Sequence, residues 1–160
     1  MLLHLLRHAD AGDPATWDGP DAARPLSDKG RAQAKRLGMF LSGIKFTGDP
    51  FITSPKVRAA QTAEIAASPL HGHVVVDERL ASALTLEDLE AILHDAGDPE
   101  RPVLVGHDPD FSEIVAVLCA AAGVPMRKGA LARIEIERPL RAGGGTLRWL
   151  VPPDLLKPER

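Results

Sequence analysis

The chain has 160 residues, 44% of them hydrophobic and 26% charged, with a formal net charge of −3. This length suits one hydrophobic core, so we expect a single domain over residues 1–160. No basic block is interleaved with aromatic residues and no apolar run approaches a membrane span. We therefore expect no nucleic acid and no membrane as partner, and a cytoplasmic protein. Cys119 is the only cysteine, which excludes an intrachain disulfide.

The chain begins with an apolar run, residues 1–6, which is followed by Arg7 and His8. A strand that is apolar throughout is buried on both faces, so we predict a central parallel strand over residues 2–6. In open α/β sheets, ligands bind beyond the carboxyl ends of the strands. An unprotonated imidazole is a good nucleophile near neutral pH, and the planar fork of a guanidinium matches phosphate oxygens. Arg7 and His8 therefore indicate phosphoryl transfer through histidine.

A long segment, residues 9–25, follows this strand and carries several aspartates and glycines. The spacing of the aspartates matches no calcium loop, so we interpret them as solvated turn residues. Loops of this length in compact domains are often functional. For Trp17 two interpretations remain open: an aromatic side chain that faces the substrate, or an anchor of the loop.

The next elements are a helix, a short strand and a second helix. Ser27 is the expected N-cap of the first helix. The apolar stripe of this helix consists of Ala34, Leu37, Leu41 and Ile44. A strand is predicted over residues 51–53, and Ser54 and Pro55 are then expected as the N-cap and first residue of the second helix. Arg58 follows one turn into this helix, near the positive end of its dipole, where an anion is favoured.

The second half of the chain continues the alternation of strands and helices. We predict a strand over residues 74–76, a helix that begins with a capping box of Thr85 and Asp88, and an apolar strand over residues 103–105 that leads to His107. Asp108 and Pro109 are expected to open the last helix. Each of these strands is short and apolar, as expected for buried parallel strands.

Two alternating segments end the pattern, over residues 131–136 and 147–151. We expect both to be edge strands that are joined by the glycine turn at residues 143–145. The whole pattern predicts an α/β protein, a three-layer sandwich with a largely parallel central sheet flanked by helices.

Three predicted strands thus end in groups that suit an oxyanion: Arg7 with His8, Arg58, and His107. Because the carboxyl ends of parallel strands meet at one edge of the sheet, we expect these side chains to form one site. Two arginines supply enough positive charge to bind phosphate without a divalent ion. The chain has no glycine-rich phosphate loop and no histidines and carboxylates at metal-ligand spacing, so we expect no metal and no cofactor.

These motifs resemble those of the histidine phosphatase superfamily, which includes phosphoglycerate mutases and acid phosphatases. The resemblance rests on the Leu-Leu-Arg-His-Ala start, on Ser-Pro-x-x-Arg at residues 54–58 and on Val-Gly-His at residues 105–107. Arg-Pro-Leu-Ser at residues 24–27 resembles the superfamily's entry to the first helix. The closer match is the small SixA-type branch of phosphohistidine phosphatases, whose C-terminal strands resemble Lys-Gly-Ala at residues 128–130 and Leu-Arg-Trp-Leu at residues 147–150. Asp108 stands where that branch usually has Asn. The resemblance implies a phosphoglycerate-mutase-like fold and metal-independent catalysis.

On this interpretation His8 attacks phosphorus in line and forms a covalent phosphohistidine, which water then hydrolyses. Arg7, Arg58 and His107 hold the three equatorial oxygens of the phosphoryl group. The acid that protonates the leaving group is Glu78, Asp108 or neither. Each carboxylate has a plain alternative: Glu78 pairs with Arg79 or Arg58, and Asp108 caps the helix that follows it.

The leading hypothesis is a phosphatase for phosphohistidine in a phosphorylated protein, such as a histidine phosphotransfer domain. The alternative is a phosphatase for a small phosphorylated substrate on the same fold. A third hypothesis, from another class, is a phosphoprotein-binding module without turnover. The presence of His8 argues against the third, because an anion-binding site needs the arginines but no nucleophile.

Overall fold

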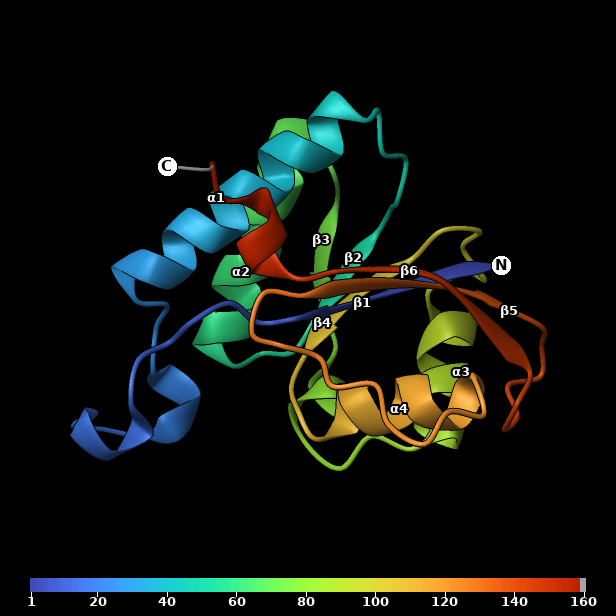
Figure 1. The fold of residues 1–160 in the computed structure, drawn as a ribbon. Coiled ribbons are helices and arrows are strands. Elements are labelled where there is room, and N and C mark those ends of the chain that lie inside the picture. Colours follow the sequence, from blue (N-terminus) through green and yellow to red (C-terminus); the bar gives the residue numbers. More distant parts are fainter. Residues whose placement is uncertain (159–160) are drawn as a thin grey trace.

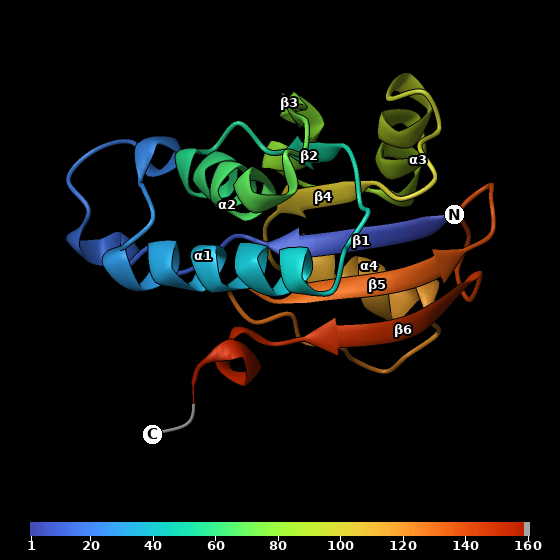
Figure 2. The same cartoon turned by 90° about the horizontal axis from the view of Figure 1, so that it is seen from above.

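The computed structural model describes residues 1–158, so the expected domain over residues 1–160 extends two residues beyond the described part. Six strands form one sheet in the order β3-β2-β4-β1-β5-β6 (Figures 1 and 2). They are β1 (Leu2–Arg7), β2 (Phe51–Thr53), β3 (Val74–Val76), β4 (Val103–Gly106), β5 (Leu131–Ile136) and β6 (Gly145–Val151). The strands β1, β4, β2 and β3 pair in parallel, whereas β5 is antiparallel to β1 and to β6. The predicted α/β class with a largely parallel sheet is confirmed.

Helices cover both faces of this sheet and complete the three layers. They are α1 (Asp28–Gly43), α2 (Val57–Ala67), α3 (Leu86–Asp95) and α4 (Asp110–Leu118). Helices α1 and α2 lie on one face, and α3 and α4 lie on the other (Figure 2). Within β1, Leu3 and Leu5 pack toward α3 and α4, whereas Leu6 packs toward α1 and α2. Since both faces are covered, every position from Leu3 to Leu6 is buried, as the unbroken apolar run predicts.

Alanines on the inner face of α2 let the helices on that side pack closely. Ala59, Ala63 and Ala66 are fully buried. A Cβ added at Gly38 of α1 would lie 2.9 Å from the carbonyl oxygen of Ala66, so the two backbones approach at a point where only glycine fits. This packing fixes α2, and with it Arg58, against the sheet.

The predicted starts of two helices are wrong by a few residues. Helix α2 begins at Val57, with Lys56 at its N-cap, so Ser54 does not cap it. Helix α4 begins at Asp110, with Pro109 at its N-cap. The Asp108 carboxylate nevertheless accepts a hydrogen bond from the backbone N–H of Ser112, at 3.1 Å, and so still stabilises the first turn.

Two expectations about the periphery are also wrong. Only β6 of the C-terminal pair is an edge strand, because β5 lies between β1 and β6. Strand β5 is hydrogen-bonded on both sides, and four of its six residues are buried despite the alternation of its sequence. Ile44, which was expected in the apolar stripe of the first helix, lies just beyond α1 and is 51% exposed.

His4 lies on β1 and is a fully buried core histidine. Its Nδ1 is 3.0 Å from the carbonyl oxygen of Pro102, and Arg133 Nε donates to its Nε2 at 2.9 Å. Burial lowers the pKa of His4 to about 4, so the ring is neutral at physiological pH.

Among residues 1–158, no helix combines the length and apolar character that crossing a membrane requires.

Candidate active site

The predicted site residues gather at the carboxyl edge of the parallel strands. Arg7 at the end of β1 is in register with Gly106 on β4, and Thr53 of β2 is in register with Val105 of β4. His8, His107 and Ser54 therefore follow three adjacent strand ends. A Cβ added at Gly106 would lie 2.7 Å from the ring of Phe111, so glycine is required where the chain turns toward His107.

The His8 ring is fixed by its own backbone surroundings. Its Nδ1 is 2.7 Å from the carbonyl oxygen of Ala9, and the backbone N–H of Gly129 donates to the carbonyl oxygen of His8 at 2.9 Å. Ala9 in turn donates its N–H to Thr62 Oγ1 on α2. An Nδ1–H that is bound to a carbonyl leaves Nε2 as the unprotonated ring nitrogen. His8 thus offers a nucleophilic nitrogen of fixed orientation.

The electrostatic surroundings keep His8 neutral. The side chain is only 6% exposed, and burial is the largest cause that lowers its pKa, to about 4. The positive charges of Arg58, Arg7 and Lys128 lower it further. These three cations therefore lie close enough to His8 to act on an anion that approaches the ring.

His107 lies next to His8 and contacts Ser54. The ring centroids of His8 and His107 are 5.3 Å apart, and His107 Nε2 is 2.7 Å from Ser54 Oγ. Because the backbone N–H of Lys56 donates to Ser54 Oγ, the hydroxyl proton of Ser54 can point at Nε2. Burial, followed by the charges of His8, Lys56 and Arg58, lowers the pKa of His107 to about 3. A neutral ring that accepts at Nε2 carries its proton on Nδ1.

Both arginines are anchored by their terminal amino groups. Arg58 Nη1 donates to the backbone oxygen of Asp21 and Nη2 to its Oδ2, each at 2.9 Å. Arg7 Nη1 donates to the backbone oxygen of Met126 at 2.7 Å and lies 3.5 Å from Asp108 Oδ2. These contacts fix each guanidinium without using its Nε–H.

Three buried N–H groups of the site have no hydrogen-bond partner within residues 1–158: Arg7 Nε, Arg58 Nε and His107 Nδ1. A buried donor without a partner costs about 1–3 kcal/mol and needs an explanation. Each belongs to one of the three residues that the sequence predicts as phosphate ligands. Donors of this kind, two of them on cations, suit a tetrahedral oxyanion in contact with His8.

The two candidates for the acid, Glu78 and Asp108, differ in the contacts that the structure gives them. Glu78 is exposed in the turn that follows β3, and within the described residues its side chain makes no hydrogen bond or ion pair. The alternative pairing of Glu78 with Arg79 or Arg58 is wrong, because Arg79 binds Asp77 and Asp95 and Arg58 binds Asp21. Asp108 binds the Ser112 hydroxyl at 2.6 Å, which continues its contact with the helix.

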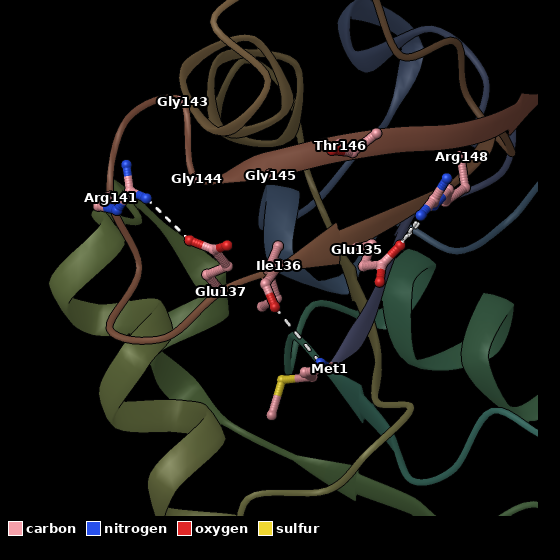
Figure 3. Close-up of a pocket in the computed structure, with 10 residues that line it drawn as sticks. All are labelled: Met1, Glu135, Ile136, Glu137, Arg141, Gly143, Gly144, Gly145, Thr146 and Arg148. Carbon is pink, nitrogen blue, oxygen red and sulfur yellow. Dashed lines mark hydrogen bonds and ion pairs between the residues drawn. The ribbon is translucent and has the colours of Figure 1, made fainter.

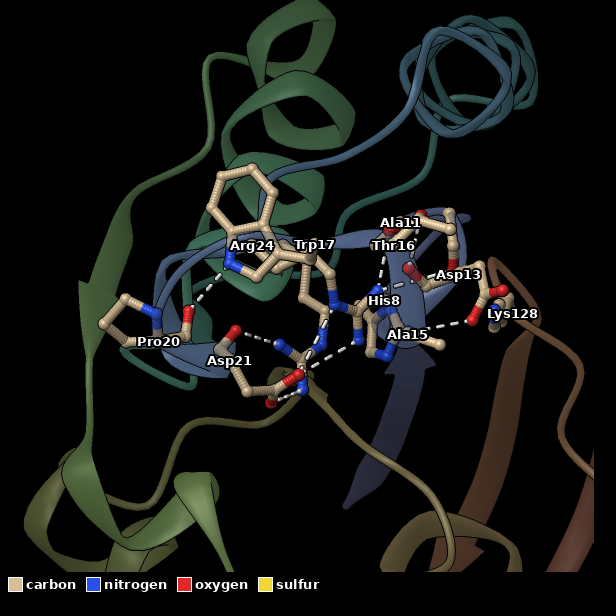
Figure 4. Close-up of polar contacts among 12 residues, drawn as sticks. His8, Ala11, Asp13, Ala15, Thr16, Trp17, Pro20, Asp21, Arg24 and Lys128 are labelled. Carbon is tan, nitrogen blue, oxygen red and sulfur yellow. Dashed lines mark hydrogen bonds and ion pairs between the residues drawn. The ribbon is translucent and has the colours of Figure 1, made fainter.

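The loop over residues 9–25 contributes more to the site than the sequence indicates (Figure 4). Its Asp21, interpreted as a solvated turn residue, contacts Arg58. Trp17 Nε1 donates to the carbonyl oxygen of Pro20 at 2.9 Å, a contact within the loop that agrees with its interpretation as an anchor, and the residue is 38% exposed. Lys128, to which the sequence assigned no role, lies before β5, and its Nζ is 3.7 Å from Asp10 Oδ1. In the sequence, the length of this loop and the Arg-Pro-Leu pattern after Asp21 marked the region, but neither pointed to Asp21 itself.

Metal ligation finds no support in the described residues, which contain no group of three or more histidines, cysteines, aspartates or glutamates that could hold a metal ion. A separate hollow lies at the opposite end of the sheet, beside Met1 (Figure 3). Its charged side chains pair with one another, Arg141 with Glu137 and Arg148 with Glu135. These four charged side chains are therefore already engaged in ion pairs with one another.

Comparison with known proteins gives consistent matches. Residues 3–102 match the family model described as histidine phosphatase superfamily (branch 1). The chain is 27% identical to phosphohistidine phosphatase SixA of Escherichia coli, over 98% of this chain and 97% of the relative. It is 38% identical to an uncharacterized protein of Picosynechococcus, over 71% of this chain and 70% of the relative. A solved structure of the protein histidine phosphatase SixA complexed with tungstate has a TM-score of 0.83 at 26% identity and covers 98% of this chain and 100% of its own.

Proposed function

Since this chain belongs to the histidine phosphatase superfamily and is an enzyme of its SixA-type branch, we propose that it hydrolyses phosphohistidine on a protein through a covalent intermediate at His8. The observation that carries this proposal is the set of three buried, unpartnered N–H groups of Arg7, Arg58 and His107 beside a neutral histidine. They are suited to bind the equatorial oxygens of a phosphoryl group while His8 Nε2 attacks its phosphorus.

In the first step, the Nε2 lone pair of His8 forms a bond to phosphorus as the bond to the substrate imidazole breaks. The substrate ring takes a proton from solvent on its other nitrogen, so it departs as neutral imidazole. The conjugate acid of that imidazole has a pKa of about 6.5, so the ring leaves readily without a dedicated acid. The hydrogen bond from Nδ1–H to the Ala9 carbonyl stabilises the positive charge that develops on the His8 ring.

In the second step, water attacks phospho-His8, the P–N bond breaks and inorganic phosphate leaves. The lowered pKa of His8 favours this step, because a less basic nitrogen is a better leaving group. A short-lived intermediate suits a phosphatase, whereas a mutase must protect its phosphoenzyme from water. Arg7 and Arg58 balance the phosphate charge in both steps, so no divalent ion is needed.

Two considerations favour a protein-borne phosphohistidine over a small phosphoester. The relative and the solved structure that match nearly the whole chain are named as phosphohistidine and protein histidine phosphatases. In addition, the Asp108 carboxylate accepts the Ser112 hydroxyl, and within the described residues the Glu78 side chain makes no hydrogen bond or ion pair with a residue of the site. A leaving group that needs little protonation suits a site in which neither carboxylate is held in place as an acid.

The test is a rapid-quench experiment with a histidine phosphotransfer domain that carries labelled phosphohistidine. We expect release of inorganic phosphate and transient acid-labile, alkali-stable phosphate on the enzyme. His8→Ala should abolish both, whereas His73→Ala, a change at an exposed histidine, should abolish neither. Arg7→Ala should slow turnover by about 10²–10³-fold, as removal of an oxyanion donor does.

The outcomes separate the candidate functions. Faster turnover of small phosphoesters than of the phosphorylated domain would support the small-substrate alternative. Tight binding of the phosphorylated domain without phosphate release would support a binding module. Phosphoenzyme that still forms in His8→Ala would exclude His8 as the nucleophile.

A further inference from the structure

Arg58 is connected to the segment beyond His8 through two side chains of the loop over residues 9–25. Asp21 Oδ2 lies 2.9 Å from Arg58 Nη2, and Asp21 Oδ1 lies 3.3 Å from Arg24 Nη2. Arg24 is 7% exposed, and its Nη1 donates to the carbonyl oxygen of Ala11 at 2.6 Å. The contacts thus run from the Ala11 carbonyl to Arg24 and on to Asp21 (Figure 4). From Asp21 they continue to Arg58.

The contact with Asp21 uses the two ends of the Arg58 guanidinium and leaves its middle N–H unpaired. The Asp21 backbone oxygen takes Nη1 and its carboxylate takes Nη2, each at 2.9 Å. Arg58 Nε is buried and has no partner within residues 1–158. An arginine side chain has many rotamers, and freezing one of them costs conformational entropy. A two-point contact therefore fixes the direction of the remaining N–H before any anion binds.

We propose that Asp21 is a positioning residue, which aims Arg58 Nε–H at the phosphoryl group, and that Arg24 holds Asp21 in place. This inference rests on the proposed function, because it assigns the task of Asp21 to that same site. Arg24 binds both the Asp21 carboxylate and the carbonyl oxygen of Ala11, which lies four residues after the end of β1. Through these contacts the position of Arg58 is fixed relative to that of His8.

Asp21 has a different task from that of an acid. Burial acts to raise its pKa, but hydrogen bonds and charges of Arg58 and Arg24 outweigh burial and hold the pKa of Asp21 below its ordinary value. Asp21 is therefore a carboxylate at neutral pH, with no proton for a leaving group. A carboxylate near an anion site repels the anion by its charge, so a benefit from Asp21 to anion binding must come through Arg58.

The experiment measures the affinity for tungstate by calorimetry, which does not depend on turnover, and in parallel kcat/KM on a phosphohistidine protein. Asp21→Ala should weaken tungstate binding by about 10-fold, because charge-assisted hydrogen bonds that fix a donor are worth this much. Asp18→Ala, at an exposed aspartate of the same loop, is the matched control and should leave the affinity within about 2-fold. Asp21→Glu should restore part of the loss.

A double-mutant cycle with Arg58→Ala gives the readout that a merely structural role would not change. If Asp21 acts through Arg58, Asp21→Ala should have less than about a 2-fold effect once Arg58 is alanine. Equal losses in both backgrounds would overturn the proposal, and so would tighter tungstate binding by Asp21→Ala, which would identify the carboxylate as a competitor. Wild-type protein that binds tungstate but leaves phosphohistidine intact overturns the proposed function alone. Failure to bind any oxyanion overturns both.

Discussion

His107 Nε2 and Ser54 Oγ lie 2.7 Å apart and join the ends of strands β4 and β2. Ser54 is fully buried, and its Oγ also accepts the backbone N–H of Lys56 at 3.2 Å, which leaves its own proton for His107. A hydroxyl that donates to Nε2 selects the neutral tautomer with the proton on Nδ1, and in the proposed function this Nδ1–H is the donor for phosphate.

Ser54→Ala should lower kcat/KM by about 10-fold, because His107 loses the hydrogen bond that selects its tautomer. The matched control is Ser42→Ala, at an exposed serine near the end of α1, which should retain full activity. Nitrogen chemical shifts of His107 should show a protonated Nδ1 in the wild type and a mixture of tautomers in Ser54→Ala. Unchanged activity of Ser54→Ala would contradict this role.

The free energy of unfolding should fall as the pH drops from about 6.5 toward 4. His4, His8 and His107 have pKa values lowered to about 4, about 4 and about 3 in the folded state, while the unfolded chain titrates near 6.5. Between these values the unfolded state binds more protons, so stability rises with pH and is fully present only above the unfolded pKa. Each histidine contributes a slope of up to about 1.4 kcal/mol per pH unit.

Urea denaturation at pH 7.5, 6.0 and 5.0 measures this slope. His8→Ala should reduce the slope by about one histidine's share. A free energy of unfolding that stays constant over this range would contradict the burial of neutral histidines.

Much of the site follows from the sequence because its residues are adjacent to strand ends. Arg7 and His8 end the apolar run of β1, and His107 follows the apolar run of β4. A parallel sheet brings the carboxyl ends of its strands to one edge, and this does not depend on the conformation of the loops. The position of Arg58 followed in the same way, although α2 begins at Val57, two residues later than the predicted first residue Pro55.

The contacts of the long loop could not be predicted in this way. Asp21 and Arg58 are separated by 37 positions, and their contact depends on the path of an irregular segment with no periodic pattern. Ser54 has the sequence features of a helix cap, and only the register of β2 and β4 reveals that it faces His107 instead. Short-range capping rules describe local hydrogen bonds, whereas this pair forms across the sheet.

Turnover should be independent of divalent metal. Arg7 and Arg58 supply the positive charge at the site, and the three unpartnered donors match an oxyanion without a bridging ion. Enzyme treated with excess EDTA should keep the kcat of untreated enzyme on a phosphohistidine protein, and added magnesium should not raise it. Activity that is lost in EDTA and restored by magnesium would show that the two arginines do not suffice.

The need for an acid should depend on the leaving group. An alkoxide is a poor leaving group without a proton. Neutral imidazole is a much better one, because its conjugate acid has a pKa of about 6.5. We therefore expect Glu78→Gln and Asp108→Asn to retain phosphohistidine turnover within about 3-fold, since neither carboxylate has to donate a proton in that reaction. For an aryl phosphate, if it is cleaved at all, we expect Glu78→Gln to cost more than Asp108→Asn. Glu78 is exposed and unpaired within the described residues, while Asp108 is bound to Ser112.

The comparison is made on both substrates across the pH range. The control is Glu87→Gln, at an exposed glutamate in the first turn of α3. A loss confined to the aryl phosphate and to Glu78→Gln identifies Glu78 as the acid for esters. Asp108→Asn also removes the negative charge that lies 3.5 Å from Arg7 Nη1, so a small change in KM without a change in kcat is expected there. A large loss of kcat on phosphohistidine in either variant would mean that a dedicated acid is required, which weakens the assignment of phosphohistidine as the substrate.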